Sequence, residues 1–300
     1  MKNTRTYFKV AGNYFFAILF LMAVLTACEK VEKPYLPMPA PPNPPANDTV
    51  RKILVEEYTG HRCLNCPHAA EAIHTAQEYH PNQIIVLAIH PTNAGANNTG
   101  PTTTDGFIYD FRNTVGDKYF TDFKIPFAIP QIVVNRKINS STGLYVVDSY
   151  QNVKTNNIDT LNFKMDPLVY IKISNTYDLS TKQLQANITT MCRHTLAGNY
   201  KLVVLLTQDS IIAPQKKDAL VIKEYNHKHV LRACIDGSDG SGNAMASIIK
   251  GANYSFNYNY PIPDMYKNIP VDPQHCNVLA FIYNEATKEV IQVQEGKIIK

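Results

Sequence analysis

The chain has 300 residues, 18% of them charged, and a formal net charge of +4 at pH 7. This length is too great for one small core and suits two domains. Residues 1–27 carry three positive charges and no negative charge, so the remaining chain has a formal charge of +1. The nearly neutral remainder of the chain lacks the net positive charge that is typical of proteins that bind nucleic acid.

The N-terminal segment has the pattern of a bacterial lipoprotein signal. Lys2, Arg5 and Lys9 precede an apolar stretch at residues 14–25, and small residues lead into Cys28. The stretch is shorter than the roughly 20 residues of a spanning helix. We therefore expect residues 1–27 to be a signal peptide, Cys28 to be lipidated, and the lipid to anchor the chain in the membrane.

Residues 28–50 are expected to form a tether. Seven prolines lie between Pro34 and Pro45, and this density keeps a chain extended and without a core of its own. The tether would hold the folded part, from about Arg51 onward, away from the bilayer.

The first folded unit is expected at residues 51–162. An apolar strand at residues 53–55 leads into a stretch with helical spacing that ends before Pro81. Residues 84–89 are continuously apolar, which predicts a strand buried on both faces. This order predicts a parallel βαβ unit.

The rest of this unit is less regular. A polar loop follows at residues 91–105, and residues 107–119 have some helical character. Strands at residues 132–135 and 143–147 would complete the sheet, with a weak helix at residues 148–154. The whole unit is predicted to be an α/β domain.

Cys63 and Cys66 stand at the start of the predicted helix. Attack on a disulfide requires a thiolate, and a helix N-terminus and a neighbouring cation both lower the pKa of a cysteine. Arg62 lies beside Cys63, and His61 is one residue further back. We expect Cys63 to be the attacking thiol and Cys66 the resolving one.

Two more residues belong to the predicted site. Glu57 precedes Cys63 by six residues, the spacing at which thioredoxins carry a buried acid, so it is the candidate proton acceptor for Cys66. Glu56 is the alternative inward-facing acid. Directly before a strand, Pro130 resembles the proline that thioredoxin-like proteins hold in the cis form, with Pro126 as the competing candidate.

Other interpretations of the cysteine pair are weaker. A c-type haem site needs His directly after the second cysteine, but Pro67 stands there. Zinc usually takes four ligands, and this unit has one cysteine pair with scattered histidines. A structural disulfide closing so short a loop would stabilise little. We expect neither a cofactor nor a metal.

From Met165 onward short strands dominate, and several alternate apolar and polar residues. This pattern favours antiparallel, half-exposed sheets and a β-sandwich, of the immunoglobulin-like kind, at residues 163–300. The strands are expected at residues 168–173, 184–189, 200–207, 228–235 and 278–284, with a turn at residues 237–242.

The second unit carries Cys192, Cys234 and Cys276, so at most one pair forms among them. His227 and His229 alternate along one predicted strand. Their spacing is a weak metal signal against ordinary strand packing.

The combination resembles the outer-membrane-protein-28-related lipoproteins. The resemblance lies in the lipoprotein signal, the tether, the segment Val55 to Pro67 and the segment His227 to Ala233. It implies an outer membrane location, a thioredoxin-like domain and a β-sandwich, but no settled activity; adhesion has been suggested. Thioredoxins place Gly-Pro between their cysteines, whereas Leu64-Asn65 stands here, which leaves the direction of electron flow open.

Two functional hypotheses follow. In the first, the protein is a thiol-disulfide oxidoreductase of the cell envelope, with Cys63, Cys66, Glu57, Pro130 and Arg62 as its site. It would act on envelope or surface proteins and need a redox-recycling partner. In the second, it is an adhesion or ligand-binding lipoprotein that uses the same fold as a scaffold.

Overall fold

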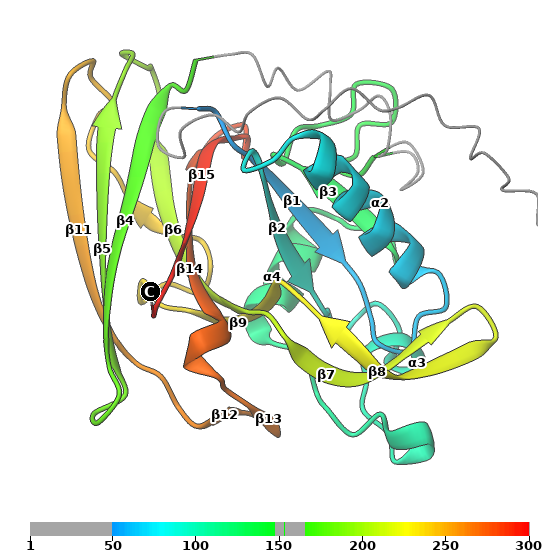
Figure 1. Cartoon of the computed structure of the whole chain (residues 1–300). Coiled ribbons are helices and arrows are strands. Elements are labelled where there is room, and N and C mark those ends of the chain that lie inside the picture. Colours follow the sequence, from blue (N-terminus) through cyan, green and yellow to red (C-terminus); the bar gives the residue numbers. More distant parts are fainter. Residues whose placement is uncertain (1–49, 148–152, 154–165, 300) are drawn as a thin grey trace, which may run out of the picture. The chain divides into compact units, whose positions relative to one another are not determined.

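The computed structural model describes residues 50–147, 153 and 166–299 (Figure 1). The signal peptide, Cys28, nearly all of the tether and the expected boundary at residues 162 and 163 lie outside the described residues, as does most of the expected helix at 148–154. No helix in the part that the structure describes is long and apolar enough to cross a membrane.

The N-terminal half contains a strand, helix and strand in the predicted order. Strand β1 (Ile53–Tyr58) is followed by helix α2 (Cys66–Tyr79) and strand β2 (Ile84–Ile89). The two strands are parallel, with Ile53 opposite Ile84. Every residue of β2 is buried, as its continuous apolar sequence predicts.

After β2 the chain contains short helical segments before it returns to the sheet. These are α3 (Ala96–Thr99), η1 (Thr104–Gly106) and α4 (Thr114–Asp122). Strand β3 (Gln131–Val134) then pairs antiparallel with β1. Instead of a further strand, residues 143–147 contribute one isolated bridge between Val133 and Val146.

The C-terminal half consists of strands. They are β4 (Val169–Asp178), β5 (Gln183–Cys192), β6 (Tyr200–Gln208), β7 (Ile211–Lys217), β8 (Leu220–His227), β9 (Val230–Cys234), β10 (Asn243–Ala244), β11 (Asn253–Pro261), β12 (Met265–Tyr266), β13 (Ile269–Pro270), β14 (Cys276–Asn284) and β15 (Val290–Lys297), with η4 (Pro273–His275) before β14.

The largest sheet joins strands from both halves in the order β15-β14-β6-β9-β2-β1-β3, with β10 beside β6. The βαβ strands thus belong to a sheet that continues into the C-terminal strands, because β2 pairs with β9 through Ala88 and Val230. Strands dominate the described residues, and only α2 and α4 among these helices exceed one turn. The expected fold class, an α/β thioredoxin-like domain followed by an all-β immunoglobulin-like sandwich, is therefore wrong.

A sandwich-like arrangement is present within this mostly β fold. The three-stranded sheet β11-β5-β4 packs against β6, β14 and β15 through a shared apolar core (Figure 1). Strands β4 and β5 alternate buried and more exposed residues, as predicted for half-exposed sheets. In contrast, β6 and β14 are buried on both faces, because alternate residues enter two different cores.

Candidate functional site

Cys63 and Cys66 form a disulfide that lies at the end of β1 and the start of α2. Cys66 is the first residue of the helix, after Asn65 as N-cap, whereas Cys63 lies in the preceding turn. Both cysteines are buried, with 4% and 1% of their surfaces exposed. The helix N-terminus is therefore closer in sequence to Cys66 than to Cys63, the expected attacking residue.

The turn before Cys63 is fixed by a close backbone approach. A Cβ atom on Gly60 would lie 2.5 Å from the carbonyl oxygen of Asn98, so a larger residue would push these segments apart. The Arg62 amide donates a hydrogen bond to the same oxygen at 3.0 Å. Glycine at position 60 thus sets the path of the chain into the disulfide.

Of the two candidate prolines, Pro130 is preceded by the cis peptide bond, as predicted. The Cys63 Sγ atom lies 3.6 Å from the carbonyl oxygen of Ile129. The structure therefore brings Pro130 and the disulfide together.

The two acidic residues of β1 have different surroundings. Glu57 lines a cavity beside Cys66, and burial raises its pKa to about 7 against the opposing effect of a hydrogen bond from Thr59. Glu56 is paired with Arg136, whose Nη2 atom lies 2.6 Å from Oε1. Glu57 is thus the acid next to the disulfide, and Glu56 belongs to the core.

The two expected cationic neighbours of Cys63 both contact the Gly100 carbonyl oxygen. Burial lowers the pKa of His61 to about 4, so its imidazole is neutral at neutral pH. The Arg62 Nη1 atom donates to the Gly100 carbonyl oxygen at 3.3 Å. The prediction that His61 supplies positive charge to Cys63 is wrong, because the ring is desolvated against Phe107 and Phe111.

A hairpin formed by β7 and β8 packs against the disulfide turn. The Lys216 amide donates to the His61 carbonyl at 2.9 Å, and the Asp218 amide donates to the Leu64 carbonyl at 3.0 Å. The Gln215 side chain is buried, and its Nε2 atom lies 3.1 Å from the Cys63 carbonyl oxygen. This hairpin thus holds the backbone that carries the cysteines.

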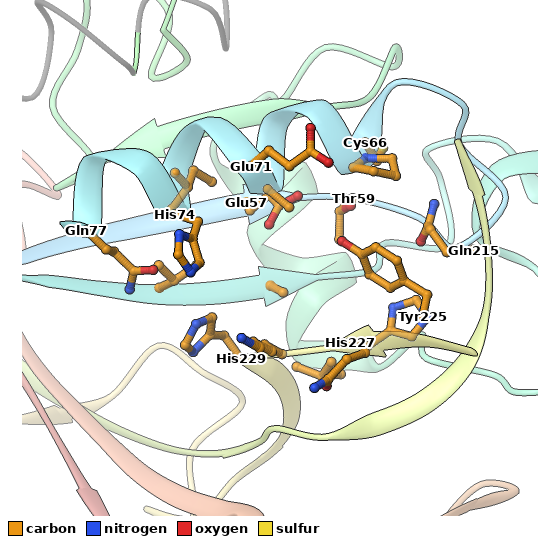
Figure 2. A pocket seen from close by; sticks show the side chains of 18 of the residues that line it. Glu57, Thr59, Cys66, Glu71, His74, Gln77, Gln215, Tyr225, His227 and His229 are labelled. Carbon is orange, nitrogen blue, oxygen red and sulfur yellow. The ribbon is translucent and has the colours of Figure 1, made fainter. Parts of the chain in front are cut away.

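A cavity of about 500 Å³ lies between α2 and the β8–β9 segment (Figure 2). Glu57, Thr59 and Cys66 line it on one side, and Tyr225 and His227 of the hairpin line it on another. The apolar part of the lining includes Ile73, Val86 and Ala88. The cavity therefore combines apolar surface with a buried carboxyl group.

A second cavity of about 390 Å³ lies beside the first, and both are lined by His74, Gln77, Lys228 and His229. Figure 2 shows His74 and Gln77 on α2 and His229 on the opposite wall. Two further basic side chains line the second cavity, His275 of η4 and Lys297 of β15.

His227 at the end of β8 and His229 just after it have separate environments. His227 is buried against Phe111, with 4.7 Å between ring centroids, and burial lowers its pKa to about 3. His229 Nδ1 lies 3.4 Å from Asp209 Oδ1. Within the described ranges no group of three or more His, Cys, Asp or Glu residues is placed to hold a metal ion.

Cys192, Cys234 and Cys276 are free thiols in the structure. Cys192 and Cys276 are buried, and burial raises the pKa of both Cys234 and Cys276 to about 12. These three residues lie apart from the disulfide and do not line either cavity.

Sequence reasoning missed the hairpin and its Gln215 and Tyr225, and it placed His227 on a strand without linking it to the cysteine turn. Ile211–Lys217 reads Ile-Ile-Ala-Pro-Gln-Lys-Lys, without apolar–polar alternation and with an internal proline, so its sequence carries no clear strand signal. Its contact with the cysteine turn carries no local signature, because the two segments are about 150 residues apart in the chain.

One solved structure is similar in fold over most of the chain. HBP35 of Porphyromonas gingivalis matches with a TM-score of 0.63 and 13% sequence identity, covering 84% of this chain and 76% of that one. A crystal structure of a domain of the outer membrane lipoprotein Omp28 from Porphyromonas gingivalis matches with a TM-score of 0.31 and 17% identity, covering 44% of this chain and 88% of that one.

Sequence comparison gives the family. None of the curated proteins matches this chain. The family model described as outer membrane protein Omp28 matches residues 117–300, which is more than half of the sequence. The chain therefore belongs to the Omp28 family of outer membrane proteins.

Proposed function

We propose that this protein is an outer membrane lipoprotein that binds a small organic ligand in the cavity beside the Cys63–Cys66 disulfide. The observation that carries this proposal is the Glu57 carboxyl group, which is 6% exposed and lines the cavity. No cationic side chain of the described residues contributes to its raised pKa. A buried carboxyl group without a cation costs folding stability. Carboxyl groups of this kind cluster at functional sites, and a ligand can pair with Glu57 here.

The cavity has the size and composition of a ligand site. Its volume of about 500 Å³ falls within the range of small-molecule pockets. Apolar wall from Ile73 and Val86 is combined with the polar groups of Glu57, Thr59 and Tyr225. Such a site favours a ligand with an apolar body and a polar end that reaches Glu57.

The experiment is a thermal-shift comparison of the full chain with a cavity-filling variant. The probes are butylamine, butyric acid, glucose and tetra-alanine, one for each ligand class. Ala70→Phe fills the cavity from α2, and Glu78→Phe places the same ring on the same helix outside the cavity. We expect at least one probe to raise the Tm of the wild type and of Glu78→Phe but not of Ala70→Phe. Equal shifts in all three proteins, or none, would contradict the proposal.

The position at the membrane is part of this proposal. We infer that a lipid on Cys28 anchors the chain and that residues 28–50 tether the folded part, which faces the periplasm or the cell surface. Cys28→Ser should release the protein from the membrane fraction of cells. Retention of this variant in the membrane would reject the lipid anchor.

Thiol-disulfide exchange is the second candidate function. It is favoured by the position of Glu57 next to Cys66, with a pKa of about 7, where a carboxyl can exchange protons with a thiol. In this candidate Cys63 attacks, Cys66 resolves and Pro130 and Arg62 flank the site. Protein substrates of the envelope and a recycling partner would be required, and the β7–β8 hairpin would have to leave the cysteine turn.

Equilibration of the full chain with glutathione buffers tests the second candidate. Exchange catalysts titrate between about −270 and −120 mV, and a reversible transition of the Cys63–Cys66 pair in this range would support it. Alkylation of Cys63→Ser/Cys66→Ser gives the background from the three free cysteines. A pair that stays oxidised far below this range would leave ligand binding as the function.

A further inference from the structure

We propose that the two adjacent cavities form one groove for a short peptide with free ends, whose ammonium group binds Glu57 and whose carboxylate binds Lys228 and Lys297. This inference rests on the proposed ligand-binding function and names its ligand class.

The acidic position is Glu57. Its carboxyl group is buried, and Thr59 is the polar neighbour that counteracts the effect of burial on its pKa. In Figure 2, Glu57 lies between α2 and the Tyr225 side of the cavity. A ligand ammonium group would supply the positive charge that the surrounding described residues do not supply.

The basic end lies in the second cavity. Lys228, His229, His275 and Lys297 line it, together with one acid, Asp209. Asp209 already accepts hydrogen bonds from the His229 amide at 2.7 Å and from Asn277 Nδ2 at 3.0 Å. Among the described residues neither lysine forms an ion pair with an acid, so both remain available to a ligand carboxylate.

The length of the groove fits a short peptide. Residues from Cys66 to Gln77 line it along α2, and this part of the helix rises about 16 Å at about 1.5 Å per residue. An extended peptide advances about 3.3 Å per residue, so about four residues fit along it.

Tetra-alanine, its N-acetylated form and its C-terminal amide are the probes, and isothermal titration calorimetry of the full chain at pH 8 is the measurement. We expect tetra-alanine to bind at least about tenfold more tightly than either blocked form, because each block removes one charged contact. No binding of tetra-alanine, or equal binding of the three forms, would overturn the inference.

Variants assign each end. Glu57→Gln should abolish the preference for a free amino group and keep the preference for a free carboxylate. Lys228→Met/Lys297→Met should do the reverse. Lys223→Met/Lys250→Met removes two exposed lysines outside both cavities and should change neither preference. Survival of the amino-group preference in Glu57→Gln, or of the carboxylate preference in Lys228→Met/Lys297→Met, would overturn the assignment.

A non-peptide probe distinguishes a wrong peptide assignment from a cavity that binds no ligand. If butylamine or another non-peptide probe shifts the Tm in the Ala70→Phe comparison while tetra-alanine does not bind, the cavity is a ligand site and the peptide assignment is wrong. Circular dichroism melting of each variant at pH 8 shows whether it is folded.

Discussion

The two faces of β1 at Glu56 and Glu57 offer a direct comparison, because the residues are identical in type and adjacent in sequence. Glu56 is fully buried and has its charge matched by Arg136, with Arg136 Nε 3.0 Å from Oε2. Glu57 is almost as buried, but it faces a cavity and its pKa is raised to about 7. Glu56 has a cationic partner in the fold, whereas no cation among the described residues affects the pKa of Glu57.

The surroundings of Arg136 explain why its face of the sheet is structural. Its guanidinium group lies over the rings of Tyr119, Phe123 and Phe281, at 4.3 to 4.7 Å from their centroids. These rings come from α4, the segment after it and β14, so the ion pair connects both halves of the chain. On the other face, Ile53 and Val55 pack against α2, and the cavity begins at Glu57.

The largest effect is expected on the Glu56 face. Arg136→Met should lower the free energy of unfolding by about 3–5 kcal/mol, because it leaves the Glu56 carboxylate buried without a partner. Urea denaturation measures this loss. Arg193→Met is the control, since Arg193 is exposed over Tyr170, and it should cost less than about 1 kcal/mol. Equal small losses in both variants would show that the ion pair is not a structural anchor.

The next effect is a pH dependence on the Glu57 face. The folded pKa of about 7 lies above the unfolded value near 4.5, so the folded state holds the proton more tightly. Stability should therefore fall as pH rises from about 4.5 through 7, by up to about 3 kcal/mol in total. The wild type should lose this amount relative to Glu57→Gln in denaturation series across that range.

The histidines act in the opposite direction in this experiment. Burial lowers the pKa of His61 to about 4 and that of His227 to about 3, so their protonation favours unfolding as pH falls below about 6.5. Both proteins in the comparison share these groups, so the difference curve isolates Glu57. A flat difference between pH 4.5 and 7 would contradict the raised pKa.

A smaller effect is expected at the hairpin. Gln215→Ala removes the side-chain hydrogen bonds to the carbonyl groups of Cys63 and Gly60, which should cost about 1–3 kcal/mol and loosen β7 and β8. Hydrogen exchange should become faster at amides such as Lys216 and Asp218. Gln183→Ala, at an exposed position of β5, is the control. Unchanged exchange in the hairpin would mean that Gln215 does not hold it to the turn.

Much of the local structure was predictable from the sequence. The apolar run Ile84–Ile89 gave a strand buried on both faces, and the segment after Cys66 gave a helix that ends before Pro81, because these patterns depend on neighbouring residues. The cis bond before Pro130 was also predicted correctly. Glu56 and Glu57 are adjacent on a strand and therefore face opposite sides of the sheet. The sequence did not show which of the two sides holds the disulfide.

The sheet order was not predictable in this way. That β2 pairs with β9, and that β6 and β14 separate two cores, depends on contacts between segments far apart in the chain. The same limit hid the hairpin at the cysteine turn and the groove, since Glu57, His74 and Lys297 come together only in the folded chain.

The most direct test of the account is the pKa of the Glu57 carboxyl group. It can be measured by carbon-13 NMR of the full chain labelled at glutamate side-chain carboxyls, with Glu57→Gln to assign the resonance. We predict a pKa of about 7, as a buried carboxyl without a neighbouring cation requires. A value near 4.5 would show that Glu57 is hydrated or paired with a cation, and would contradict its role as the ligand-binding carboxyl group.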